Sequence, residues 1–167
     1  ISGAVNLRFD ATDDAQFTLT KGTENIAESV NAPVEIKFFF SKSSENIPVQ
    51  VKNYASRVED LLKEIIAVNP EKLSLQLIDP KPDTDEELEA QGFGLEAIPM
   101  PSGSSLIFGG VFLQGKEEIS IPFFNPDREQ QLEYDLAEAL LNATQTQKAK
   151  IGVMSSIPVL GAMNPSN

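Results

Sequence analysis

Two periods of hydrophobic residues run along the chain, one typical of strands and one typical of helices. Apolar and polar residues alternate in residues 5–9 and 73–77, which predicts two half-buried strands. Residues 34–40 are rich in β-branched and aromatic residues and predict a central strand. Pro48 opens a helix whose apolar residues fall on one stripe. We expect this stripe to be buried against the 34–40 strand; its members are Tyr54, Val58, Leu61, Leu62, Ile65 and Val68.

Cap and turn signals predict the remaining elements. Thr20 is a suitable N-cap for a short helix, and residues 83–92 suit an acidic helix that ends at a glycine. Two β-rich runs, residues 105–113 and 118–124, flank a hairpin turn. A last helix begins at residues 125–127. The pattern predicts an α/β fold with a mixed central sheet and flanking helices.

The order of these elements also predicts the domain organisation. Residues 34–79 form a β-α-β unit, whose crossover helix implies parallel strands. Residues 151–154 have strand composition and are interpreted as the first strand of a following α/β domain. We therefore predict one domain over residues 1–147 and the truncated start of a second over residues 148–167. The chain lacks an initiator Met and a readable export signal, so we interpret it as a fragment.

Composition narrows the chemistry available to the chain. Its 167 residues contain no His and no Cys, which excludes a histidine base, a cysteine nucleophile and imidazole or thiolate metal sites. The net charge of −12 repels phosphate backbones and anionic lipid surfaces, so we expect no nucleic-acid partner. A chain without cysteine fits the cytosol and equally an extracytoplasmic bacterial domain. We predict no cofactor.

A β-α-β unit followed by a hairpin and a helix resembles the order of a thioredoxin-like fold. Ile98–Pro99 precedes the first hairpin strand, where thioredoxins place their cis-proline. Residues 41–44 read Ser-Lys-Ser-Ser at the position where a redox member carries its two cysteines. The resemblance therefore implies the architecture without the redox chemistry, and a fold does not imply a function.

Short motifs along nearly the whole chain resemble the GldG-type proteins, the extracytoplasmic auxiliary components of ABC transport systems associated with gliding motility. None of these motifs is catalytic. They are RFDAT at 8–12, TLT at 18–20, PV at 33–34, LIDP at 77–80, FGL at 93–95, IP at 98–99, IPF at 121–123, LEYDL at 132–136 and KIGV at 150–153.

This resemblance implies a location and a set of partners. In that family a membrane helix precedes the Arg-Phe-Asp segment, and a second α/β domain starts near the Lys-Ile-Gly segment. The full-length protein would be tethered at the periplasmic side of the bacterial inner membrane. Its partners would be the permease and ATPase subunits of the transporter. The related module in intraflagellar transport proteins implies a binding scaffold.

Acidic residues 83–89 raise the question of a calcium site. Five carboxylates lie within seven residues, at Asp83, Asp85, Glu86, Glu87 and Glu89. Scored as a calcium-binding loop from Asp83, position six lacks its glycine and position twelve lacks its glutamate. We therefore predict a solvated acidic helix and no metal site.

Carboxylate pairs and serines are the remaining catalytic candidates. Glu117 with Glu118, and Glu133 with Asp135, would need carboxyl groups roughly 5–10 Å apart for glycoside hydrolysis. Serines gather at residues 41–44 and 102–105, but no histidine exists to activate one. We predict no catalytic residue, with Ser-Lys catalysis open and unsupported.

Four further features have a structural and a functional interpretation. Loop 99–105 is expected to be an exposed loop, because it leads into a strand and lacks the context of a phosphate-binding loop. Gly109–Gly110 predicts a bulge, a close backbone approach or a docking point for a partner strand. Phe38–Phe40 predict a strand buried on both faces, with an aromatic binding surface as the alternative. Arg8 and Asp10 are interpreted as a structural ion pair.

These expectations favour a non-catalytic binding or scaffold domain and assign no partner-binding residue. Two alternatives stay open: an accessory domain of a carbohydrate- or peptide-processing envelope enzyme, and a solute-binding module. The acidic charge predicts that basic partner surfaces associate faster at low salt.

Overall fold

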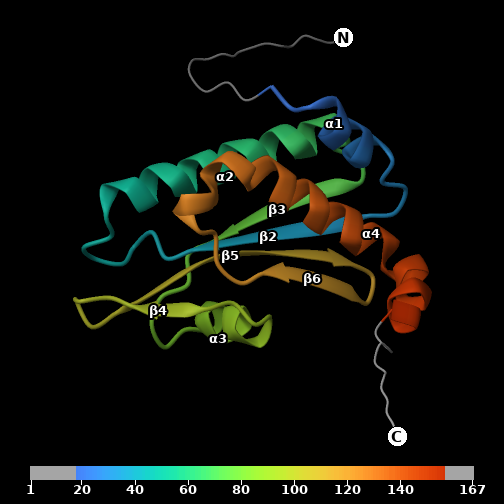
Figure 1. The fold of residues 1–167 in the computed structure, drawn as a ribbon. Helices are drawn as coiled ribbons and strands as arrows, with labels where there is room; N and C mark the ends of the chain where they lie inside the picture. The colour runs from blue at the N-terminus through green and yellow to red at the C-terminus, as the bar shows by residue number, and fades with distance from the viewer. Residues whose placement is uncertain (1–17, 157–167) are drawn as a thin grey trace, which may run out of the picture.

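A computed structural model describes residues 18–156 of the chain, and the side chains of residues 18–145. Strand 5–9 and the Arg8–Asp10 pair therefore lie outside the described residues. The elements are shown in Figure 1. In chain order they are α1 (Lys21–Glu28), β2 (Val34–Phe40), α2 (Val49–Val68), β3 (Leu73–Ile78), α3 (Asp85–Gly92), β4 (Ala97–Pro99), β5 (Ser105–Gln114), β6 (Glu117–Ile121), the 3₁₀ helix η2 (Pro126–Gln131) and α4 (Leu132–Ser156).

The sheet is mixed, as the sequence predicted. β2 pairs in parallel with β3, and β5 pairs antiparallel with β2. The first residues of β5 pair with β4, and its last five pair with β6. The β-α-β unit, the hairpin and the following helix are thus confirmed as one α/β arrangement.

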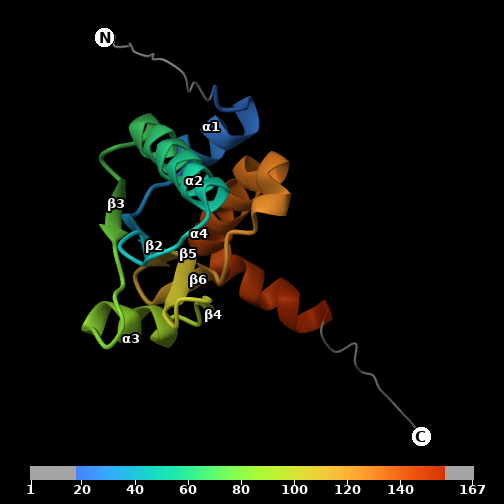
Figure 2. The ribbon, with the colours of Figure 1, turned by 90° about the vertical axis from the view of Figure 1, so that its left-hand side faces the viewer.

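Two hydrophobic cores cover the two faces of the sheet. Helices α1, α2 and α4 cover one face, and α3 lies on the other (Figure 2). Phe38 belongs to the first core and Phe39 to the second, because successive side chains of a strand point to opposite faces. The prediction that β2 is buried on both sides is confirmed. The α2 stripe is also confirmed, since Leu61, Leu62 and Ile65 are at most 2% exposed.

Gly109 is a site of close backbone approach, as one interpretation of the glycine pair predicted. A Cβ atom there would lie 2.6 Å from the Ile121 carbonyl oxygen and 3.0 Å from that of Pro122. The hairpin turn is confirmed as well, with Gly115 at φ 62°. A positive φ at this position favours glycine.

Three expectations were wrong. Residues 151–154 lie within α4 and are helical, so they do not form a strand. The Ile98–Pro99 peptide is trans, because the described residues contain no cis peptide bond. The second hairpin strand ends at Ile121, since Pro122 has no N–H to continue the ladder.

The predicted domain boundary after residue 147 falls inside α4, and the division into two domains stays a prediction. Within residues 18–156, no helix combines the length and the apolar composition needed to cross a bilayer.

Candidate functional site

Three loops meet at one end of the sheet, where the parallel strands β2 and β3 have their carboxyl ends. They are the loop after β2, the loop after β3 and the loop between β4 and β5. In open α/β sheets, this is the end at which ligands usually bind. The loops enclose a pocket of about 300 Å³. It is lined by Ser43, Ser44, Glu45, Lys81, Pro82, Ser102 and Ser104.

Serine hydroxyls hold the loop after β2 in place. Ser41 is 1% exposed, and its Oγ accepts a hydrogen bond from the Ile107 N–H at 3.0 Å. Ser43 donates from its N–H and its Oγ to the Asp79 carboxylate, which joins this loop to the one after β3. The serine run is therefore partly structural: at least two of its hydroxyls connect neighbouring segments.

The loop between β4 and β5 forms a closed turn. The Met100 N–H donates to the Ser104 carbonyl at 2.8 Å, and the Gly103 N–H donates to the Met100 carbonyl at 2.9 Å. Gly103 has φ 92°, which a residue with a Cβ rarely adopts. Ser102 and Ser104 share a hydrogen bond of 2.9 Å between their hydroxyls. The turn presents both hydroxyls at the pocket.

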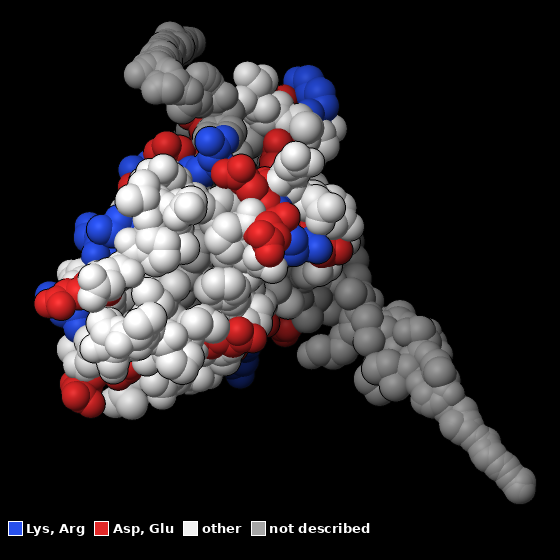
Figure 3. All heavy atoms as spheres, turned by 60° about the vertical axis from the view of Figure 1, so that its left-hand side comes forward, with Lys and Arg blue, Asp and Glu red and all other residues white. Residues whose placement is uncertain are grey.

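The loop end also carries a broad uncharged surface. Figure 3 shows white atoms over most of this face, with acidic and basic groups at its margin. Two of the loop segments at this end, residues 46–51 and 99–104, contain no charged residue. Val49 is 68% exposed, and Pro101 is exposed as well. We call this face, including the pocket, the loop face.

The two segments that the thioredoxin resemblance singled out do come together. Ser44 Oγ donates to the Ser105 carbonyl at 3.4 Å, which connects residues 41–44 to the segment after Pro99. The juxtaposition agrees with the predicted architecture. Their chemistry differs, because the loop offers hydroxyls in place of thiols and the proline is trans.

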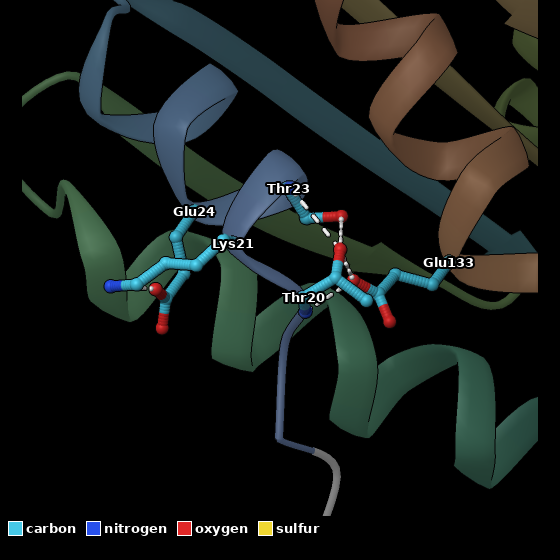
Figure 4. A network of polar contacts seen from close by, with 5 residues as sticks. All are labelled: Thr20, Lys21, Thr23, Glu24 and Glu133. Atoms are coloured by element: carbon cyan, nitrogen blue, oxygen red, sulfur yellow. Dashed lines mark hydrogen bonds and ion pairs between the residues drawn. The ribbon is translucent and has the colours of Figure 1, made fainter.

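Glu133, a predicted catalytic candidate, joins two helices instead. Its Oε1 accepts hydrogen bonds of 2.8 Å from both the N–H and the Oγ1 of Thr20, the N-cap of α1 (Figure 4). Burial alone would raise the pKa of Glu133, but hydrogen bonds from Thr23 and Thr20 outweigh it and lower that pKa. A carboxylate stabilised in its charged form by two threonines is suited to holding α4 against α1.

The other predicted carboxylates also have structural surroundings. Asp135 pairs with Arg128 at 2.7 Å in the first turn of α4. Glu117 and Glu118 are neighbours on β6, so their side chains point to opposite faces and do not form a pair around one substrate.

Burial, together with the carboxylates of Asp135 and Glu129, raises the pKa of Tyr54 to about 12. Tyr54 therefore stays protonated near neutral pH.

The acidic segment 83–89 forms the predicted helix. Thr84 is its N-cap, and Glu87 accepts a hydrogen bond of 2.9 Å from the Asp83 N–H. Glu89 forms an ion pair with Lys37 of β2. Within the described ranges, no three acidic side chains are grouped as metal ligands would be.

The serine run 41–44 and the exposed loop 99–105 were identified from the sequence, but neither the uncharged surface nor the pocket was. Lys81 and Glu45 line it together with four serines from two loops. Lys81 and Glu45 are 36 residues apart, so no motif contains both. The uncharged surface could have been predicted from segments that lack charged residues and contain proline and serine.

Residues 13–114 match a family described as a domain of unknown function, DUF7088. The match spans more than half of the chain and includes β2, α2, β3, α3 and most of the loop face. No curated protein and no solved structure matches the chain. The chain belongs to the DUF7088 family.

Proposed function

We propose that this chain is a non-catalytic, partner-binding domain of an extracytoplasmic auxiliary component of an ABC transport system. The GldG-type resemblance suggests the system, and the loop face supports the mode of action. In a chain with net charge −12, the loop face is largely uncharged outside its pocket, where Glu45 and Lys81 lie, and a largely uncharged surface loses less solvation when a protein docks on it. This uncharged loop face is the observation that carries the proposal.

The surroundings of the carboxylates support binding over catalysis. Glu133 and Asp135 are engaged with Thr20 and Arg128, and Glu117 and Glu118 diverge. A general acid or base needs a free group within hydrogen-bond reach of its substrate. Each of the four carboxylates proposed from the sequence is either bound to a neighbouring side chain or points away from its supposed partner.

The net negative charge of the chain would act while a partner approaches. Long-range charge changes association rates more than it changes the stability of the final complex. The net charge of −12 would therefore attract basic surfaces of the transporter subunits, and the largely uncharged loop face would form the contact. The periplasmic side of the inner membrane is the location that the resemblance suggests.

The test is co-purification of tagged full-length protein from detergent-solubilised membranes. We expect the permease and ATPase subunits to be recovered with it. Recovery of neither subunit, or hydrolysis of a glycan or peptide by the purified chain, would contradict the proposal and favour the envelope-enzyme alternative.

The pocket favours one second candidate, a solute-binding module. Its four serines, one ammonium and one carboxylate suit a small zwitterionic or hydroxyl-rich molecule. A thermal-shift series with free amino acids and monosaccharides tests it. A rise in melting temperature with one of these compounds that is lost in Lys81→Met would support the solute-binding candidate. No change in melting temperature with any of the compounds would exclude it.

A further inference from the structure

β3 lies at one side of the described sheet and β4 and β6 lie at the other, and β3 differs from β6 in its charged residues. β6 begins with Glu117 and Glu118, is followed by Pro122, and packs against α4. Charges, a proline and a covering helix are the usual means of preventing an edge from pairing with another chain. β3 itself carries no charged residue and no proline, because residues 73–78 read Leu-Ser-Leu-Gln-Leu-Ile. Asp79-Pro80 follows it, and α2 packs on one of its faces, so the difference from β6 lies in the missing charges within the strand.

The backbone of β3 is open on its outer side. β3 is the last strand in the sheet order and pairs with β2 alone. In Figure 2 no described strand or helix lies beyond it in the plane of the sheet. The described chain supplies no backbone partner for the outward groups of residues 74–77. An edge of this kind is a template for one additional strand.

An apolar hollow lies beside this edge on the α2 side. It measures about 60 Å³, and Phe38, Phe40 and Leu77 supply its apolar lining. Leu77 is 49% exposed although it is the fifth residue of a six-residue strand. The volume of the hollow is about that of two water molecules in the liquid. A hollow of this size fits a small aliphatic side chain.

Two charged groups at the rim of the hollow, Lys42 and Asp79, have no ion-pair partner among the described residues. Glu59 is paired with Lys63 at 2.6 Å, and Asp79 accepts from Ser43. Lys42 also lines the hollow and forms no ion pair with any described residue. A carboxylate on an incoming strand would complement it.

We propose that β3 is a docking edge for an extended segment of another protein, which adds as a strand, places a small aliphatic residue in the hollow and sets an acidic residue beside Lys42. That the occupant is another protein rests on the proposed function. A second copy of this chain is disfavoured because it would bring a second net charge of −12.

A designed peptide tests the edge directly. The probe is the capped heptapeptide Asp-Thr-Val-Thr-Val-Thr-Asp, titrated into the ¹⁵N-labelled 167-residue chain. We expect saturable shifts of the amides of residues 73–78, and binding at least about tenfold weaker after Leu77→Lys. Leu88→Lys is the matched control, because Leu88 is 64% exposed on α3, and α3 lies on the face of the sheet opposite to α2 and the hollow. A peptide with Lys in place of both Asp residues should bind more weakly.

Four results would overturn the proposal, the last of them without affecting the proposed function. The first is the absence of shifts in residues 73–78 at millimolar peptide. The second is a set of contacts from residues 5–9 to β3, which would mean that the chain's own segment fills the edge. The third is a dimer that Leu77→Lys dissociates. Full-length Leu77→Lys that recovers transporter subunits as the wild type does would overturn this edge proposal and leave the proposed function standing.

Discussion

The aromatic core around Phe108 and the loop face lie on the same sheet, yet their side chains are used in opposite ways. Phe108 is fully buried, and its ring centroid lies 5.2 to 6.1 Å from those of five other aromatic residues. At the loop face, Val49 and Pro101 are exposed, and the hydroxyls of Ser102 and Ser104 face a pocket. The aromatic side chains of the core contact one another, whereas the uncharged side chains of the loop face are exposed to solvent.

This difference predicts that substitutions in the two regions move different measurements. A core substitution should lower the free energy of unfolding whether or not a partner is present. A substitution on the loop face should leave that free energy almost unchanged and weaken binding. A variant that moves both equally would break the comparison.

Leu62→Ala should have the largest effect on stability. Leu62 is 1% exposed on α2, and removing a fully buried leucine costs about 2–5 kcal/mol in the free energy of unfolding. Urea denaturation measures it. Leu88→Ala is the control, because a leucine that is 64% exposed should change that free energy by less than about 0.5 kcal/mol. Equal midpoints for both variants would mean that the α2 stripe faces water.

Gly109→Ala should rank next, by overpacking. Its Cβ would lie 2.6 Å from a backbone oxygen, and backbone yields less readily than the end of a flexible side chain. We expect a loss of about 1–3 kcal/mol in the free energy of unfolding. Gly92→Ala meets no atom within 4 Å and should be neutral or stabilising. An unchanged melting temperature for Gly109→Ala would argue against the close approach of β5 and the segment after β6.

The core and the architecture could be predicted from sequence, because local periodicity carries them. The stripe of α2 and the three phenylalanines of β2 specify which faces are buried. The strand predicted at residues 151–154 failed because Ile151, Val153 and their neighbours have β-branched composition, while the helix that begins at Leu132 continues through them. The strand propensity of a few residues is a weak predictor when a helix that has already formed continues through them.

The loop face was predictable only in part. The serine run and the exposed loop 99–105 were predicted, but the pocket depends on side chains from three loops, and the sequence does not contain the distances between them. Glu133 shows the same limit, because its partner Thr20 is 113 residues away. When the sequence shows no partner for a carboxylate, the carboxylate is a catalytic candidate until the structure shows what it binds.

Glu133→Gln should have a smaller effect that depends on pH. The lowered pKa of Glu133 means that its charged form stabilises the fold. That contribution is complete above the ordinary value of 4.5 and is lost as the pH falls through the lower pKa of the folded state. We expect a loss of about 0.5–1.5 kcal/mol at pH 7.

Denaturation of wild type and Glu133→Gln between pH 7 and pH 3 measures this prediction. The gap in the free energy of unfolding should narrow at the acidic end. Glu64→Gln, on the exposed side of α2, serves as the reference variant. A gap that stays constant over this range would show that the contact does not depend on the charge of Glu133.

Ser102→Glu tests the central claim most directly, because it places a charge on the loop face without touching the core. Stability should change by less than about 0.5 kcal/mol. The measurement is the affinity of full-length Ser102→Glu for the detergent-solubilised transporter subunits, compared with wild type and with Ser56→Glu on the exposed side of α2. We predict binding at least about tenfold weaker for Ser102→Glu and unchanged for Ser56→Glu, since an unpaired charge at the centre of an interface costs several kcal/mol. Equal affinity of all three proteins would contradict the assignment of the loop face as the partner-binding surface.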